Sequence, residues 1–365
     1  MTEVGATLGV EEEYHLVDAG TGALADAPGV APAAIALLGR DAQTEISTSQ
    51  VEVATPVCTS LAEVREHLLR LRKGADEAAQ SYGCRILAAA THPTAHWRDQ
   101  HLTDSPRYAR VHERYGLLAL QQLIVGQHVH VSVPDPDLAV DVCDRLRPDL
   151  PLLIALSGSS PYWEGVDTGY ASYRTLWFSR FPVTGSQEVL RTRAAYDALV
   201  EDLVASGVVD DARGMYWDAR PSVLYPTVEV RVADTSPHVD NSVLQAGLTR
   251  ALVRVAAQQA ERELPFPAPR AELVRAARWR AARFGLEGQL VDLRRATKVP
   301  GAVLLREMLD TLREDLEATG DWDEVSALAE QVLRRGTSAV QQRRTGSVHG
   351  LAAVVREVVA QSTSG

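Results

Sequence analysis

Four segments of the chain alternate apolar residues, mostly valine, with glutamate, histidine or arginine, and this alternation constrains the fold more than any other feature. Successive side chains of a β-strand point to opposite faces of the sheet, so each segment has one apolar and one polar face. The pattern predicts a mostly antiparallel sheet with one face packed on a core. The segments are GVEEEYHL (9–16), QTEISTSQVEVAT (43–55), GQHVHVSV (126–133) and PTVEVRVAD (226–234).

The polar faces of these segments carry carboxylates and imidazoles in place of the usual mixture of polar residues. A single glutamate that alternates with valine usually faces water, but four segments repeating the pattern with few Lys, Ser or Thr weaken that explanation. Carboxylates that lie close together cannot all stay ionised unless cations lie between them. The residues expected to share a face within one segment are Glu11 with Glu13, His128 with His130, and Glu229 with Arg231.

Glu45 and Glu52 lie an odd number of positions apart, so one unbroken strand would place them on opposite faces. A turn at Ser47–Ser49 would bring both to the same side. Oxygen ligands with an imidazole suit Mg²⁺ or Mn²⁺ better than zinc. Such ions polarise phosphate oxygens and neutralise charge during phosphoryl transfer, so the carboxylates indicate a site for this chemistry.

The charge and the cysteines argue against several classes of protein. The chain of 365 residues has a formal net charge of −11, which argues against nucleic acid or an anionic membrane as its main partner. Its three cysteines form no CxxC, so neither a disulfide framework nor a thiolate zinc site is expected. The N-terminus lacks the pattern of a signal peptide, and no apolar run of roughly 18 residues predicts a membrane span. We therefore expect a cytoplasmic location.

The sequence also limits how a nucleotide could bind. It contains neither the GxxxxGK[ST] motif nor a GxGxxG motif after a strand. If ATP binds, metals and arginines must hold its phosphates, because a glycine-rich cradle is not available.

The order of the predicted elements favours a single domain that covers residues 1–365. Strand-like and helix-like segments alternate in the first half, including a helix over about 106–122 that begins with proline. A long irregular segment rich in Gly, Ser and aromatic residues covers 157–185, and such loops inside compact domains are usually functional or disordered. The chain from 240 to 365 is predicted to be mainly helical. We expect an α+β fold with helices packed on one side of the antiparallel sheet.

Seven motifs follow one another along the chain: GVEEEYHLVD, STSQVEVATPVC, ILAAATHP, GQHVHVSVPD, SGSSPYWEGVDTGYASYRTLWFSRFPVTG, YWDARP and TVEVRVAD. In this order they resemble the carboxylate–amine ligase family, also called the type 2 glutamate–cysteine ligase family, which is related to glutamine synthetase. The resemblance runs from about residue 7 to the end of the chain. It implies a curved, largely antiparallel sheet that forms a funnel-shaped active site. ATP would enter from one end and the amino-acid substrates from the other, with Mg²⁺ or Mn²⁺ between them.

The resemblance also implies roles for individual residues. Arg231 would contact phosphate, and Arg220 in WDARP could serve in the same role. Arg174 in YASYR is a candidate for clamping a substrate carboxylate, although each of these arginines could instead be a structural ion-pair partner. His130 would support the neighbouring histidine ligand or face the substrate. The implied metal ligands are Glu11, Glu13, Glu45, Glu52, His128 and Glu229.

The chemistry implied by the resemblance is ATP-dependent formation of an amide. The γ-phosphate would move to a substrate carboxylate, and an amine would attack the resulting acyl phosphate. Glutamate, through its γ-carboxyl, and cysteine are the substrates in the family's named case, and the activity could be weak. Two alternatives stay open: a metal-dependent hydrolase that uses the HxH and carboxylate cluster, and a non-catalytic protein that keeps only the fold. The amphipathic helices of the C-terminal third are compatible with a homodimer.

Overall fold

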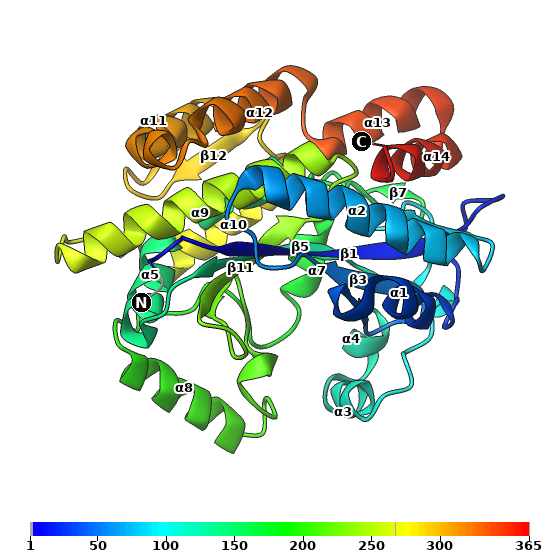
Figure 1. Cartoon of the computed structure of the whole chain (residues 1–365), viewed down its shortest axis with the longest axis horizontal. Coiled ribbons are helices and arrows are strands. Elements are labelled where there is room, and N and C mark those ends of the chain that lie inside the picture. The colour runs from blue at the N-terminus through cyan, green and yellow to red at the C-terminus, as the bar shows by residue number, and fades with distance from the viewer. Residues whose placement is uncertain (1–2, 267, 365) are drawn as a thin grey trace.

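A computed structural model describes residues 3–266 and 268–364 of the chain, and its centre is a seven-stranded sheet (Figure 1). Its strands are β1 (Leu8–Asp18), β2 (Ala42–Thr44), β3 (Gln50–Ala54), β4 (Cys84–Leu87), β5 (Gly126–Ser132), β10 (Ala219–Pro221) and β11 (Thr227–Asp234). Six strands follow the order β10-β11-β5-β1-β3-β2, and β4 pairs with the C-terminal part of β1. All of these pairings are antiparallel, as the alternation predicted.

One face of this sheet packs against helices and forms the main core. Valines at alternate strand positions, such as Val129, Val131, Val228 and Val230, are at most 4% exposed and form one apolar cluster with four helices next to the sheet and with helices later in the chain. Burial of such a side chain contributes about 1.5–3 kcal/mol, so the alternation decides which face of each strand turns inward. The four helices are α2 (Leu61–Gln80), α5 (Pro136–Leu146), α6 (Leu150–Ser157) and α9 (Val239–Glu261).

The chain after α9 is helical apart from one hairpin that the sequence analysis did not predict. Asp292 accepts the backbone N–H groups of Arg294 and Arg295 at 2.8 and 3.0 Å, which closes the turn of this hairpin. Within the described residues, no helix is both long enough and apolar enough to cross a bilayer. The elements are α10 (Ala271–Phe284), β12 (Gln289–Asp292), β13 (Thr297–Pro300), α11 (Gly301–Thr319), α12 (Trp322–Arg335), α13 (Ser338–His349) and α14 (Leu351–Ser362).

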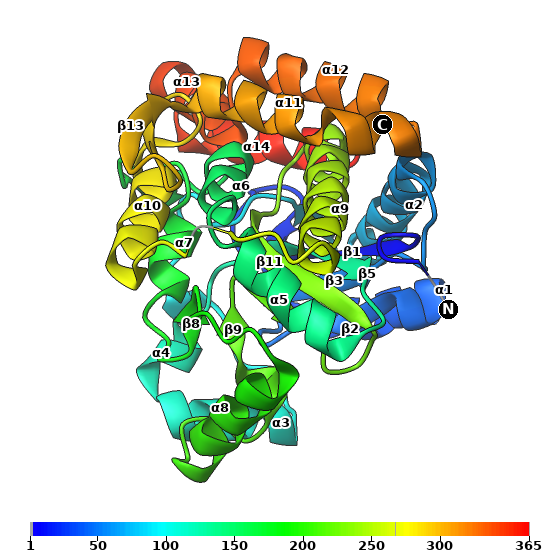
Figure 2. The same ribbon diagram turned by 90° about the vertical axis from the view of Figure 1, so that its left-hand side faces the viewer.

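The remaining elements include three helices on the side of the sheet opposite to α11 and α12 (Figures 1 and 2). These are α3 (Pro106–Tyr115), α4 (Leu117–Leu120) and α8 (Arg193–Ala205). The single helix predicted over about 106–122 is therefore two helices, because Gly116 adopts a φ of 54° that a regular helix does not allow. Elsewhere lie α1 (Val30–Leu38), α7 (Tyr173–Phe178), β6 (Tyr162–Trp163), β7 (Val166–Asp167), β8 (Thr184–Gly185) and β9 (Tyr216–Trp217).

Candidate active site

The pairing of the strands brings the polar residues of distant segments together on one face of the sheet. Residues that are directly opposite in an antiparallel pair have side chains on the same face, about 5 Å apart. The register of β1, β3, β5 and β11 therefore converts the alternation of each single strand into a continuous row of acidic and imidazole groups. The cross-strand partners are Glu11 with His128, Glu13 with Glu52, and His130 with Glu229.

These residues line a cavity of about 270 Å³. Glu45 joins them from the connection between β2 and β3, where a turn follows as predicted, so Glu45 and Glu52 reach the same cavity. Each residue selected from the sequence is part of the lining: Glu11, Glu13, Glu45, Glu52, His128, His130, Arg174, Arg220, Glu229 and Arg231.

Burial and mutual repulsion raise the pKa values of two of the carboxyl groups. Burial, together with the charge of Glu13, raises the pKa of Glu45 to about 8. Burial and the charges of Glu11, Glu45 and Glu13 hold the pKa of Glu52 well above its usual value, and Arg231 offsets this only in part. At neutral pH Glu45 therefore retains its proton unless positive charge enters the cavity, and the pKa of Glu52 shifts in the same direction. This behaviour is expected of a group of carboxylates that binds cations.

Glu11, His130 and Glu229 form the most compact set of potential ligands, with one ligand atom of each lying within 4.8 Å of the others. His130 Nδ1 lies 3.0 Å from the hydroxyl of Thr227, and its Nε2 lies 3.3 Å from Glu11 Oε1. His128 instead has Nδ1 at 3.0 Å from Glu11 Oε2. The sequence favoured His128 as the ligand, whereas this geometry groups His130 with the two carboxylates. The choice between the two histidines stays a prediction.

Glu229 lies between Arg220 and Arg231, which differ in how many donors they have left. Arg220 Nε donates to Glu229 Oε2 at 2.8 Å, and its Nη1 donates to the carbonyls of Met215 and Arg213 at 2.7 and 3.1 Å. Arg231 Nη1 also pairs with Glu229, but its Nε is buried and has no hydrogen-bond partner in the described part of the chain. Although burial opposes ionisation, the two arginines hold the pKa of Glu229 well below its usual range. Arg231 is therefore the better placed of the two to meet a ligand.

Several lining residues were missed by the sequence analysis, because they come from helices and irregular connections that show no alternation. Tyr108 on α3 donates its hydroxyl to the carbonyl of Thr44 at 3.2 Å. Tyr225, between β10 and β11, lies edge-on to His130 with ring centroids 6.0 Å apart. The aromatic residues of segment 157–185 were the sequence signal that this segment could contribute to the cavity lining. Further lining residues include Arg107, Phe178, Phe181, Arg213 and Tyr216.

Comparison with known proteins identifies the family of the chain. The family model described as glutamate–cysteine ligase family 2 (GCS2) matches residues 7–357. The chain belongs to glutamate–cysteine ligase family 2. This family is of the ATP-dependent ligase type, and the match confirms the resemblance seen in the motifs.

Relatives in glutamate–cysteine ligase family 2 are similar over nearly all of this chain, but some of them are much longer. "Putative glutamate--cysteine ligase 2-1" of Nocardia farcinica is 42% identical over 360 residues, which cover 98% of this chain and 94% of that protein. "Putative glutamate--cysteine ligase 2-3" of Frankia alni is 43% identical over 357 residues, which cover 98% of this chain and 41% of that protein. The chain thus spans about two fifths of the length of the Frankia relative.

Two solved structures share the fold of this family member at low sequence identity. Glutamate–cysteine ligase (gshA) of Francisella tularensis, in complex with AMP, matches with a TM-score of 0.73 and 16% identity, covering 100% of this chain and 90% of that one. A bifunctional glutathione synthetase of Pasteurella multocida matches with a TM-score of 0.73 and 16% identity, covering 98% of this chain and 52% of that one. These likenesses confirm the predicted fold class.

Proposed function

We propose that the chain is an ATP-dependent carboxylate–amine ligase that forms an amide through an acyl phosphate. The observation that carries the proposal is the convergence of five glutamates, two histidines and three of the arginines on one cavity. ATP and a substrate carboxylate repel each other, so a site that joins them must supply positive charge. Buried carboxylates can do so by binding divalent cations, and arginines do so directly.

The residues in the cavity fit Mg²⁺ or Mn²⁺. Hard oxygen donors predominate, and the buried Nε2 of His130 lies 3.3 Å from Glu11 Oε1 but makes no well-directed hydrogen bond among the described residues. The raised pKa values of Glu45 and Glu52 mean that added positive charge would stabilise the ionised forms of both groups. A divalent ion held here would polarise phosphate oxygens and offset the negative charge of the reactants. The proposed ligands are Glu11, Glu13, Glu45, Glu52 and Glu229, with an imidazole from His128 or His130.

The three arginines take different roles in this proposal. Arg231 stabilises the transferring phosphoryl group, because a planar guanidinium can bridge two oxygens. Arg174 binds a carboxylate of the substrate. Arg220 holds Glu229 in position, since its donors are engaged by that carboxylate and two backbone carbonyls. The contribution of the chain to the reaction is thus positioning and charge stabilisation.

Glutamate, reacting through its γ-carboxyl, and an amine such as cysteine are the proposed substrates. The names of relatives about 42% identical to this chain support this choice. The structure of the Francisella tularensis ligase, which contains AMP, supports an adenine nucleotide as the third substrate.

Release of phosphate from ATP tests the proposal directly. The purified chain is incubated with Mg²⁺ or Mn²⁺, ATP, glutamate and a panel of amines, and amide products are identified by mass spectrometry. Release that depends on both glutamate and an amine would support the ligase. Formation of a product without ATP would indicate the metal-dependent hydrolase. An absence of turnover with every pair of glutamate and amine would contradict an enzymatic role.

A further inference from the structure

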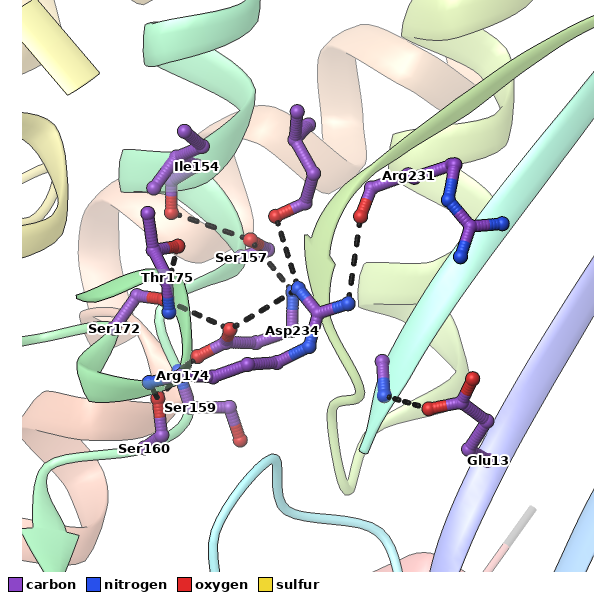
Figure 3. A network of polar contacts seen from close by, with 12 residues as sticks. Glu13, Ile154, Ser157, Ser159, Ser160, Ser172, Arg174, Thr175, Arg231 and Asp234 are labelled. Atoms are coloured by element: carbon purple, nitrogen blue, oxygen red, sulfur yellow. Dashed lines mark hydrogen bonds and ion pairs between the residues drawn. The ribbon is translucent and has the colours of Figure 1, made fainter. Parts of the chain in front are cut away.

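A buried aspartate at the end of β11 organises the segment that carries Arg174 (Figure 3). Asp234 is fully buried, and its Oδ2 accepts the backbone N–H of Ser159 at 2.9 Å and the hydroxyl of Ser160 at 2.7 Å. Its Oδ1 accepts the hydroxyl of Ser172 at 2.8 Å, and Ser172 is the N-cap residue of α7. One carboxylate thus joins the two ends of the segment 159–172, which contains the β6–β7 hairpin.

A β-bulge in β11 decides where Asp234 points. Glu229 pairs with His130 and Asp234 pairs with Gly126, so β11 uses five positions where β5 uses four. Directly paired residues point to the same face of the sheet, so the extra residue brings Asp234 to the face that holds Glu229. Regular alternation would have turned Asp234 toward the apolar core. Bulges redirect side chains in this way next to active sites.

Arg174 is held against the cavity wall by the same set of contacts. Its backbone N–H donates to the hydroxyl of Ser160 at 3.1 Å, and its Nη1 lies 3.9 Å from Asp234 Oδ1. Its Nη1 and Nη2 also reach the carbonyls of Val232 and Arg231, in the bulge, at 3.5 and 3.4 Å. These contacts are long for charge-assisted hydrogen bonds, so the guanidinium keeps donor capacity for a ligand.

Gly126 provides the surface on which this guanidinium lies. A Cβ atom at Gly126 would collide with the guanidinium of Arg174. The N–H of Gly126 donates to Glu13 Oε2 at 2.6 Å. Arg174 therefore lies against the same glycine that binds the carboxylate of Glu13, as Figure 3 shows.

We propose that Asp234 is a positioning residue: through Ser160 and Ser172 it fixes the guanidinium of Arg174 where that group binds a carboxylate of the substrate. Asp234 is not part of the cavity lining, so its effect reaches the substrate through Arg174. The inference rests on the proposed function, in which Arg174 is the carboxylate-binding residue.

Steady-state kinetics of Asp234→Asn test this role. The variant keeps the size of the side chain but removes the charge near Arg174, so KM for the carboxylate substrate should rise about tenfold while kcat and KM for ATP change less than about threefold. Arg174→Ala should raise the same KM, and the double variant should be no worse than Arg174→Ala alone. An unchanged KM in Asp234→Asn, or additive effects in the double variant, would overturn the inference.

Gly126→Ala provides an independent variant that leaves Asp234 intact. The added methyl group occupies the place of the guanidinium, so this variant should also raise KM for the carboxylate substrate. An unchanged KM would mean that the position of Arg174 does not matter and would overturn the inference.

Hydrogen exchange tests the same role without turnover. Backbone amides of 159–175 should exchange faster in Asp234→Asn than in the unaltered chain, and equal rates would count against the role. Asp144→Asn is the matched control, because Asp144 is also buried and accepts the N–H groups of Leu190 and Arg191 at 2.9 and 2.7 Å, outside the cavity lining. It should leave exchange in 159–175 and KM unchanged. If no substrate pair is turned over, the proposed function fails while the exchange rates still decide the positioning role.

Discussion

Glu12 and Glu13 are neighbours in β1, but their side chains lie on opposite faces of the sheet and have different charged neighbours. Glu12, on the apolar face, accepts hydrogen bonds from Arg72 at 2.8 and 2.7 Å and from the hydroxyl of Tyr14 at 2.6 Å. Although burial opposes ionisation, Arg72 lowers the pKa of Glu12. Glu13, on the polar face, lies opposite Glu52, whose pKa is raised well above its usual value by burial and by nearby carboxylates. A buried charge with its counter-charge is typical of a structural ion pair, whereas crowded like charges are expected of a site that binds cations.

Removal of the counter-charge on the apolar face should have the largest effect. Arg72→Met leaves Glu12 buried and unpaired, so we expect the free energy of unfolding to fall by about 3–5 kcal/mol in urea denaturation. Arg70→Met is the control on the same helix, because the pair of Arg70 with Asp41 is partly exposed and contributes about 1 kcal/mol or less. Equal losses in the two variants would remove the distinction between a buried and a surface ion pair here.

Glu52→Gln should lower activity and leave the fold intact, whereas Glu229→Gln should also lower stability, because Glu229 pairs with Arg220 and Arg231. Glu52→Gln and Glu229→Gln should each lower ATP turnover at least about 100-fold, which is about 2.7 kcal/mol in activation free energy. Without metal, Glu52→Gln should unfold at the same or a higher temperature, because one repelling carboxylate is gone. Glu63→Gln, on the surface of α2, should leave turnover unchanged. Undiminished ATP-dependent product formation in the Glu52 or Glu229 variant would contradict the site assignment.

Metal binding distinguishes the two histidines of β5. His130→Gln should weaken Mn²⁺ binding about tenfold, because His130 lies with Glu11 and Glu229, whereas His128→Gln should weaken it about threefold or less. Electron paramagnetic resonance of free Mn²⁺ measures both affinities without turnover. The reverse order would restore His128 as the ligand, as the sequence favoured.

The smallest expected effect is a pH dependence of stability in the absence of metal. The folded chain raises the pKa of Glu45 to about 8, so at this group it binds more protons than the unfolded chain between about pH 4.5 and pH 8, and Glu52 acts in the same direction. The contribution of these two groups to stability should therefore fall as pH rises, by less than about 1.4 kcal/mol per pH unit for each extra proton bound, whereas the buried His15 and His92, whose pKa values are lowered, act in the opposite direction. The difference in thermal unfolding between the unaltered chain and Glu45→Gln, followed across this pH range, isolates the contribution of Glu45, and saturating Mg²⁺ should remove that difference. A difference of the opposite sign would contradict the raised pKa of Glu45.

The period-two pattern was sufficient to predict the central sheet and the residues on its polar face, because side-chain direction in a strand depends only on position. It could not choose between His128 and His130, which share a face; the hydroxyl of Thr227, on the next strand, orients His130. The pattern also could not indicate the role proposed for Arg220, because that role depends on the partners that engage its donors. It assigns Asp234 to the wrong face, because the bulge in β11 is not visible in the alternation. The single-domain organisation, the cytoplasmic location and the homodimer stay predictions.

The β-bulge of β11 also limits how the chain can change in length. Deleting Val232 would restore regular alternation and rotate Asp234 into the apolar core, so the wall of the cavity would be lost although every side chain of the site remained in the sequence. The connection 222–226 at the tip of the same hairpin, where Leu224 is 72% exposed, can vary in length without this consequence. In β11 the number of residues therefore matters to the site as much as their identity.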